Sequence, residues 1–176
     1  MSLFSGTCLL DSEAQDAERY IRTLKRCAPG QIATDWILGF GHSVFTLLET
    51  NRPPVEILDE AIPNKPAAIM EETSHSVWVN SKALEDAGIT ADTPNPPGGV
   101  IMKDLATGKP NVILIDNAGN MVMDLAFTPT LDLEQLNYEG LLESLDLLAE
   151  NGITSVADAR TYRTRNHHKA WLRAEA

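Results

Sequence analysis

Apolar residues return at helical spacing in three segments of the first half of the chain. The first segment predicts a helix over residues 12–27, with Ser12 or Asp11 as its N-terminal cap. Its apolar positions, near a period of 3.6 residues, are Ala14, Ala17, Ile21 and Leu24. A second helix is expected to start at Pro53-Pro54 and run through Ala61. A third, short helix should begin at Asn80 or Ser81 and end before Gly88, which suits a left-handed conformation.

Short apolar runs between these helices favour strands. The run "DWILGFGHSVF" indicates a strand that leads into a turn, and "PAAIME" indicates a second strand. The residues "TPNPPGG" suit neither a helix nor an interior strand. After them, "VIMKD" and "NVILID" flank "LATGKP", and their β-branched residues around a Thr-Gly turn predict a β-hairpin.

The second half of the chain predicts a long helix followed by one strand. Asp132 with Gln135 resembles a capping box at the start of this helix, and Asn151-Gly152 marks its end. Its apolar face is expected to comprise Tyr138, Leu141, Leu142, Leu145 and Leu148. "ITSVAD" then favours a buried strand, the αβ half of an α/β repeat, and residues 166–176 can form a further helix. With no internal repeat and no flexible linker, we expect one domain or one piece of a domain.

Composition and charge narrow the class of protein. The 176 residues, 43% of them hydrophobic, suit one globular unit with a core. A net charge of −11 argues against nucleic acid as a partner, because phosphate binding needs clustered lysine and arginine. No apolar run is long enough to span a membrane, and the first residues lack the basic region of a signal peptide. Cys8 and Cys27 cannot form a disulfide framework, so we expect reduced cysteines and a cytoplasmic location.

Four blocks, in order along the chain, carry a family resemblance. "TDWILGFGH" is similar to a Trp-Ile-x-Gly-x-Gly-Trp run, and "TSHSVWVNSKAL" to an Asp-Gly-His-x-x-Trp-Val-Asn-Ser-x-Ala-Leu motif. "PPGGVI" and "NGITSVADA" resemble a proline-glycine turn and a second barrel strand. These are motifs of the family-3 amidohydrolases, metal-dependent hydrolases with a TIM-barrel core that cleave C–N bonds other than ordinary peptide bonds. The family's Asp-Gly-His is here Thr73-Ser74-His75, its Gly-Trp is Gly41-His42, and its Glu-Asn is Asp116-Asn117.

The resemblance implies a fold class and a division of the chain. A TIM barrel takes about 250 residues, so a chain of 176 residues implies an α/β fragment of a TIM-barrel hydrolase with an α+β insertion. We expect one partial domain over 1–176, with the insertion at about 11–130 and a helix-strand-helix of the barrel at about 131–176. The intact family uses zinc or another divalent metal to activate water for attack on a small amide-like substrate. With most of the barrel absent, the open edges of a strand at 153–157 would favour self-association.

Three candidates for substrate contact lie in the Thr-Ser-His block. His75 precedes the short helix, where an imidazole could bind substrate or orient a carboxylate such as Glu71 or Glu72. Hydrogen bonds to the local backbone would explain His75 equally well. Trp78 could form a wall of a concavity shared with His75, although large aromatics more often anchor cores. Asn80 could touch a ligand, although its place as a helix cap accounts for it fully.

A fourth candidate for substrate contact is Asp158, at the carboxyl end of the strand expected at 153–157, where TIM-barrel chemistry gathers. His167-His168 invites a metal interpretation, but adjacent residues on a helix point about 100° apart, and the chain holds no His-x-His pair. We therefore expect neither metal ligands nor catalytic residues here, and an inactive part of a metal-dependent amidohydrolase. The alternative is a non-enzymatic protein-binding or assembly module that keeps the insertion fold.

Overall fold

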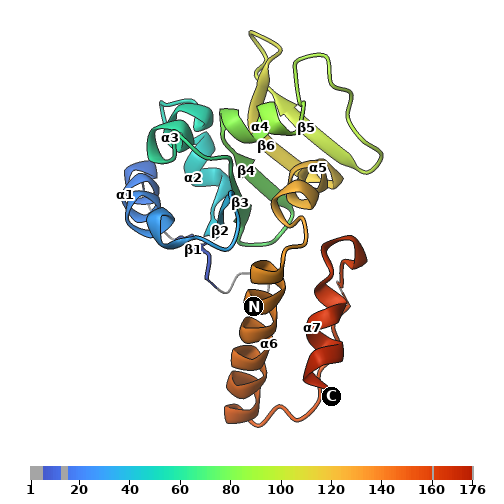
Figure 1. Ribbon diagram of the computed structural model, residues 1–176. Coiled ribbons are helices and arrows are strands. Elements are labelled where there is room, and N and C mark those ends of the chain that lie inside the picture. Colours follow the sequence, from blue (N-terminus) through green and yellow to red (C-terminus); the bar gives the residue numbers. More distant parts are fainter. Residues whose placement is uncertain (1–5, 13–15, 160, 176) are drawn as a thin grey trace. The chain divides into compact units, whose positions relative to one another are not determined.

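The computed structural model describes residues 6–12, 16–159 and 161–175. The chain divides into two compact units (Figure 1): a sheet unit, residues 7–126, and a helical unit, residues 1–6 and 127–176. The sheet unit contains both helices and strands, whereas the helical unit contains helices and irregular segments among its described residues. The expected α/β class is confirmed.

The sheet unit is built on a six-stranded mixed sheet with the strand order β1-β2-β3-β4-β6-β5. Its strands are β1 (Cys8–Leu9), β2 (Ile37–His42), β3 (Ala67–Glu71), β4 (Ser76–Val79), β5 (Gly99–Lys103) and β6 (Pro110–Asp116). The first three strands run parallel, and β4, β6 and β5 are each antiparallel to their neighbours. Strands β2 and β3 and the β5–β6 hairpin occupy the apolar runs that predicted them.

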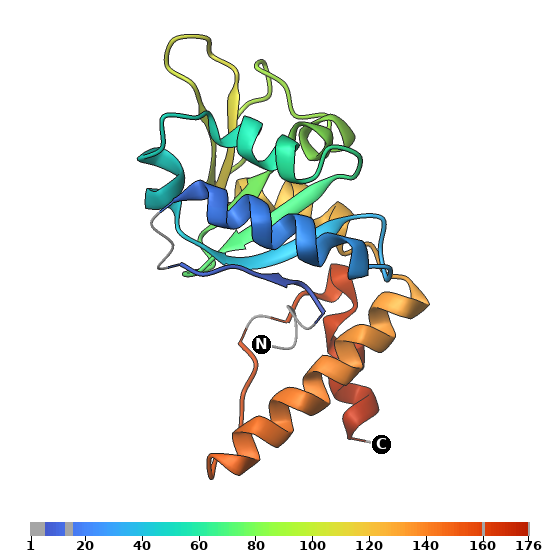
Figure 2. The ribbon, with the colours of Figure 1, turned by 90° about the vertical axis from the view of Figure 1, so that its left-hand side faces the viewer.

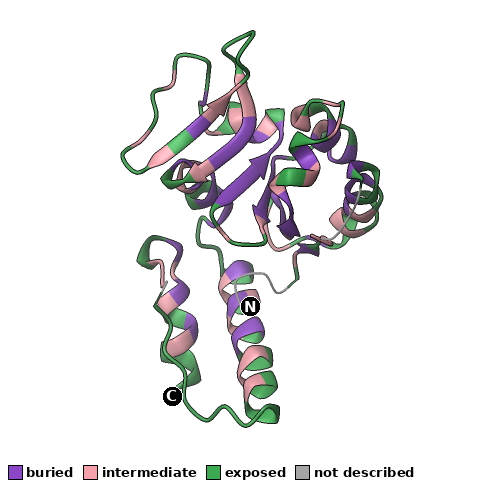
Figure 3. Ribbon diagram, turned by 180° about the vertical axis from the view of Figure 1, so that it is seen from behind, coloured by how far each residue is buried: buried purple, intermediate pink, exposed green. Residues whose placement is uncertain are grey.

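Helices cover both faces of this sheet. They are α1 (Ala17–Cys27), α2 (Val44–Leu48), α3 (Pro54–Ala61), α4 (Ser81–Asp86) and α5 (Asn117–Ala126), with a 3-10 turn η2 at Ala28–Gly30. Figure 2 shows α1 and α3 over one face of the sheet. On that face Trp78 is completely buried, and its indole Nε1 donates to Pro54 O at 3.0 Å. Val77 points to the other face and contacts α5 where Gly119 leaves room for it, so β4 is buried on both sides (Figure 3).

Local sequence signals predicted three of these helices, α1, α3 and α4, but neither α2 nor α5. The cap of α1 is Asp16, whose side chain accepts from Arg19 N at 2.8 Å, so the predicted caps Ser12 and Asp11 are wrong. Ala14, expected on the apolar face of this helix, lies outside the described residues. The cap of α4 is Asn80, and Gly88 follows the helix with φ of +64°, as predicted.

The expectation of two reduced cysteines is wrong for this structure. Cys8 in β1 and Cys27 at the end of α1 form a disulfide, with Cα atoms 5.7 Å apart. The two residues are separated by 19 positions, which alone predicts no pairing, and they meet because α1 returns to contact β1. The bridge ties a two-residue edge strand to a helix that packs on α3.

The helical unit contains α6 (Leu131–Glu150), a 3-10 turn η3 (Arg163–Arg165) and α7 (His167–Ala174), which packs on α6. The cap of α6 is Thr130, whose hydroxyl accepts from Leu133 N at 3.1 Å, so the capping box at Asp132 is wrong. The buried residues of α6 are Leu133, Asn137, Gly140 and Leu141. Leu142 of the expected face is exposed, because it lies off the face that these four buried residues share at helical spacing. None of the helices in the described ranges has both the length and the apolar character needed to cross a membrane.

Residues 153–158 form no strand, which corrects the expected barrel strand. Ile153 and Val156 keep 45% and 44% of their surface exposed. A parallel strand needs neighbours to complete its hydrogen bonds, and no described strand pairs with this segment. Two helices joined by an irregular segment replace the expected helix-strand-helix. The open strand edge on which the self-association argument depended is therefore absent from the described residues.

Candidate functional site

Polar residues collect at one end of the sheet, where several strands begin or end. β2 ends at His42 and β3 at Glu71, and these residues are partners in the parallel register. β4 starts one residue after His75, and β6 ends at Asp116. The carboxyl ends of parallel strands are the usual place for ligand sites in open α/β sheets. We call this set, His42, Glu71, His75 and Asp116, the polar end.

His75 and Asp116 form a side-chain pair across the polar end. The imidazole Nδ1 lies 2.9 Å from Asp116 Oδ1, and the two side chains are 76% and 52% exposed. Asp116 N also donates to His75 O at 2.8 Å, which holds the two backbones side by side. The two residues are 41 positions apart, so their meeting depends on the antiparallel pairing of β4 with β6.

Tight turns carry both members of this pair. Ser74 and Asp116 have φ of 65° and 48°, a left-handed region that residues other than glycine rarely adopt. The turn before β4 is closed by Ser74 N, which donates to Glu71 O at 2.9 Å, and by Thr73 Oγ1, which donates to Glu71 Oε2 at 2.6 Å. Unusual backbone conformations of this kind gather at functional sites, where surrounding hydrogen bonds maintain them.

Trp78 does not share a concavity with His75. The indole of Trp78 is completely buried, with its ring centroid 6.1 Å from that of Tyr20 and 5.6 Å from that of His42. A completely buried indole cannot line an open pocket. The role of Trp78 in this structure is to anchor β4 under α1 and α3, and the expected shared concavity is wrong.

Asn80 is also buried, and backbone groups occupy all of its hydrogen-bonding capacity. Its Oδ1 accepts from Ala67 N at 2.9 Å and Ala83 N at 3.0 Å, and its Nδ2 donates to Ile62 O and Lys65 O, each at 2.9 Å. One amide therefore joins β3, the start of α4 and the segment between α3 and β3. This arrangement accounts for Asn80 as a structural residue, the interpretation that its capping position favoured.

His42 belongs to the core rather than to the solvent-facing part of the polar end. It is completely buried against Trp78, and neither ring nitrogen has a hydrogen-bond partner within the described part of the chain. Burial lowers the pKa of the imidazole from 6.5 to about 3, and the nearby backbone of Met70 opposes this only in part. His42 is therefore a neutral ring at pH 7.

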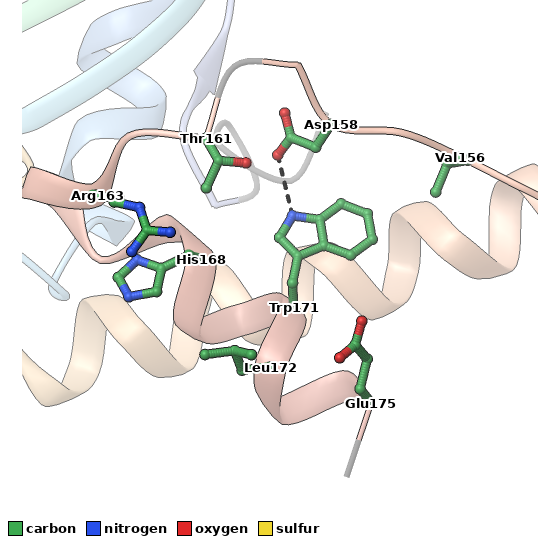
Figure 4. Close-up of a pocket in the computed structure, with 8 residues that line it drawn as sticks. All are labelled: Val156, Asp158, Thr161, Arg163, His168, Trp171, Leu172 and Glu175. Carbon is green, nitrogen blue, oxygen red and sulfur yellow. Dashed lines mark hydrogen bonds between the residues drawn. The ribbon is translucent and has the colours of Figure 1, made fainter.

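Asp158 faces a pocket of about 480 Å³ within the helical unit (Figure 4). The pocket is lined by Val156, Asp158, Thr161, Arg163, His168, Trp171, Leu172 and Glu175. Figure 4 shows the Asp158 carboxylate over the indole of Trp171, whose Nε1 donates to Oδ2 at 3.1 Å. Asp158 was singled out as the end of a barrel strand, but that strand is not formed. Asp158 reaches the pocket because an irregular segment folds against α7.

The divalent metal implied by the resemblance does not fit the described residues. No group of three or more histidine, cysteine, aspartate or glutamate side chains among them lies close enough to hold an ion. His75 and Asp116 offer at most two donors, whereas a hydrolytic zinc site uses about three protein ligands.

Asp116 was not among the candidates, although the sequence held one sign of it. Asp116-Asn117 stands where the family pattern has Glu-Asn, which marked the position as a carboxylate. Nothing in the spacing indicated that this carboxylate would meet His75. The pairing became visible only with the strand order, in which β6 lies between β4 and β5.

Proteins similar to this chain include a formamide deformylase and a putative amidohydrolase. The sequence model described as "Amidohydrolase family" matches residues 2–175. N-substituted formamide deformylase from Arthrobacter pascens is 32% identical over 172 residues, which cover 95% of this chain and 29% of that protein. Putative amidohydrolase YtcJ from Bacillus subtilis (strain 168) is 36% identical over 89 residues, or 51% of this chain and 17% of that protein. The chain thus spans less than a third of the length of these relatives.

A solved structure shares the fold. The crystal structure of an uncharacterized metal-dependent hydrolase from Pyrococcus furiosus matches 83% of this chain and 27% of its own, with a TM-score of 0.55 and 19% sequence identity. At that identity the likeness shows the fold alone. The family match covers nearly every residue, and it identifies this chain as a member of the amidohydrolase family.

Proposed function

We propose that this chain is part of a metal-dependent amidohydrolase, in which it forms a wall of the substrate site. The observation that carries the proposal is the contact between His75 and Asp116. Two blocks that resemble family motifs, far apart in sequence, place an imidazole and a carboxylate together at the end of the sheet. Family membership supports hydrolysis of C–N bonds, and the similarity to a formamide deformylase supports a small amide as the substrate.

The three candidates in the Thr-Ser-His block have different roles in this proposal. His75 contacts the substrate through its exposed ring, and Asp116 holds that ring in place. Trp78 and Asn80 have structural roles and do not contact the substrate, because both are buried and donate hydrogen bonds to backbone carbonyls. Since the described residues offer no fitting set of metal ligands, the chain is assigned substrate contact only.

The test uses the longest protein encoded by the reading frame that contains this chain. We expect it to hydrolyse N-substituted formamides and to lose that activity on chelation. His75→Ala should lower kcat/KM by about 10- to 100-fold, because a substrate group that loses its hydrogen-bond partner costs about 1–3 kcal/mol, and the melting temperature should not change. Glu72→Ala, a change at an exposed residue of the same turn, is the matched control and should leave kcat/KM as it is.

Two results would overturn the proposal. One is a longer protein that hydrolyses none of these amides, which would favour the alternative of a protein-binding or assembly module. The other is equal activity of the His75 and Glu72 variants. The 176-residue chain alone, purified without added metal, should contain no stoichiometric zinc and show no chelator-sensitive amidase activity. Finding both would place the metal centre in this chain.

A further inference from the structure

We propose that Asp116 is a positioning residue that sets the tautomer of His75, so that Nε2 becomes the hydrogen-bond acceptor at the polar end. In the amidohydrolase proposed above, that acceptor selects substrates with an amide N–H, namely secondary over tertiary amides. The substrate preference rests on the proposed function. The tautomer is a property of the chain itself and can be measured without any activity.

The geometry of the pair determines which nitrogen carries the hydrogen. Nδ1 of His75 lies 2.9 Å from Oδ1 of Asp116, within hydrogen-bonding distance. An ionised carboxylate can only accept hydrogen bonds, so Nδ1 must be the donor. A neutral imidazole with its hydrogen on Nδ1 carries its lone pair on Nε2. Because 76% of the side chain is exposed, the Nε2 side of the ring is open to a ligand.

The backbone holds the two side chains in position for this contact. Asp116 N donates to His75 O at 2.8 Å, which fixes the spacing of the two Cα atoms. Asp116 itself has φ of 48°, a conformation that aspartate tolerates better than most residues. Glu71, the other carboxylate of this turn, is engaged by the Thr73 hydroxyl at 2.6 Å and lies 3.4 Å from the backbone N of His75. Glu71 therefore stabilises the turn, and the imidazole of His75 pairs with Asp116.

An acceptor at Nε2 recognises a specific chemical feature. The N–H of a secondary amide can donate to it, whereas a tertiary amide has no hydrogen to offer. Where a bound substrate covers Nε2 and excludes water from it, an analogue without the donor leaves this acceptor unpaired and is disfavoured. N-monosubstituted formamides should therefore be preferred over N,N-disubstituted ones.

The tautomer is measured by long-range ¹H–¹⁵N correlation spectroscopy of the 176-residue chain in mildly alkaline buffer, with His75→Ala identifying the signals of His75. We expect the Nδ1–H form to be enriched. Asp116→Asn keeps the left-handed backbone but can both donate and accept, so it should lower the Nδ1–H to Nε2–H ratio by about two- to fivefold, the range of an exposed ionic hydrogen bond. Asp92→Ala, which removes an equal charge from an exposed loop, should leave the ratio unchanged.

An identical tautomer ratio in the wild-type chain and Asp116→Asn would overturn the inference, whatever activity the longer protein has. In an active longer protein, Asp116→Asn should also reduce the preference for monosubstituted over disubstituted formamides several-fold. An unchanged preference would overturn the selective role of Nε2. If the tautomer responds as expected but the longer protein hydrolyses no amide, the positioning role of Asp116 stands and the proposed function fails.

Discussion

Acid should destabilise the sheet unit through His42. The imidazole is completely buried at the end of β2, and loss of its hydration lowers its pKa from 6.5 to about 3. In the unfolded chain the same imidazole takes up a proton near pH 6.5. Between these two pKa values the unfolded state binds more protons than the folded state. Stability is therefore undiminished above pH 6.5 and falls as the pH drops toward 3.

The size of this effect follows from the gap between the two pKa values. Each pH unit below 6.5 lowers the free energy of unfolding by at most about 1.4 kcal/mol. Two units below, near pH 4.5, the loss is about 3 kcal/mol, and across the whole gap it approaches about 5 kcal/mol. Domains unfold with about 5–15 kcal/mol, so the loss near pH 4.5 is readily measured. Carboxylates such as Glu60, whose pKa is lowered mainly by a hydrogen bond from Arg52, add to the acid sensitivity.

His42→Phe separates the imidazole from these carboxylates. Phenylalanine keeps a flat ring against Trp78 and removes both buried nitrogens, while Glu60 titrates alike in both proteins. Urea unfolding near pH 7 and pH 4.5 can be followed by tryptophan fluorescence in a Trp171→Phe background, where Trp36 and Trp78 report on the sheet unit alone. We expect the protein with His42 to lose about 3 kcal/mol more than the variant. Equal losses in both proteins would refute the reasoning, since they would mean that His42 gains a proton as easily folded as unfolded.

Two other side-chain links should prove structural. Asn80→Ala removes four hydrogen bonds and leaves buried backbone groups unpaired, so urea unfolding should show a loss of about 3 kcal/mol in the free energy of unfolding. The control Ser81→Ala, at an exposed neighbour, should cost less than about 1 kcal/mol. Equal costs for the two variants would contradict the role of the Asn80 amide. Cys27→Ser opens a disulfide that spans 19 positions and should lower stability by about 3 kcal/mol under oxidising conditions. Added reductant should erase the difference between this variant and the original chain, and a difference that persists in reductant would count against the bridge.

The parts of the fold that depend on neighbours in sequence were predictable. The amide of Asn80 caps a helix that begins at the next residue, and Gly88 ends it with a positive φ, so both signals act within one turn. The β5–β6 hairpin was predicted by two β-branched runs around a short Thr-Gly turn, and its strands pair across that turn. In each case the residues that determine the structure lie within a few positions of each other.

Features that need a distant partner were not predictable. Residues 153–158 have the β-branched character of a strand, yet a strand forms only where another backbone completes its hydrogen bonds. The bridge between Cys8 and Cys27 depends on where α1 returns to β1, which no local spacing encodes. The buried residues of α6 likewise include Asn137 and Gly140, because burial depends on how the helix fits its neighbours as well as on hydrophobicity.

The candidate site combines both kinds of information. Sequence motifs marked His75 and the carboxylate position at Asp116 separately, because each resembles a family block. The two residues meet only because β6 lies between β4 and β5, which sets the start of β4 beside the end of β6. A one-residue shift in the β4–β6 register would move every side chain of β4 to the opposite face and bring Trp78 out of the core. The buried indole that holds β4 in register is therefore also what holds the exposed imidazole beside its carboxylate.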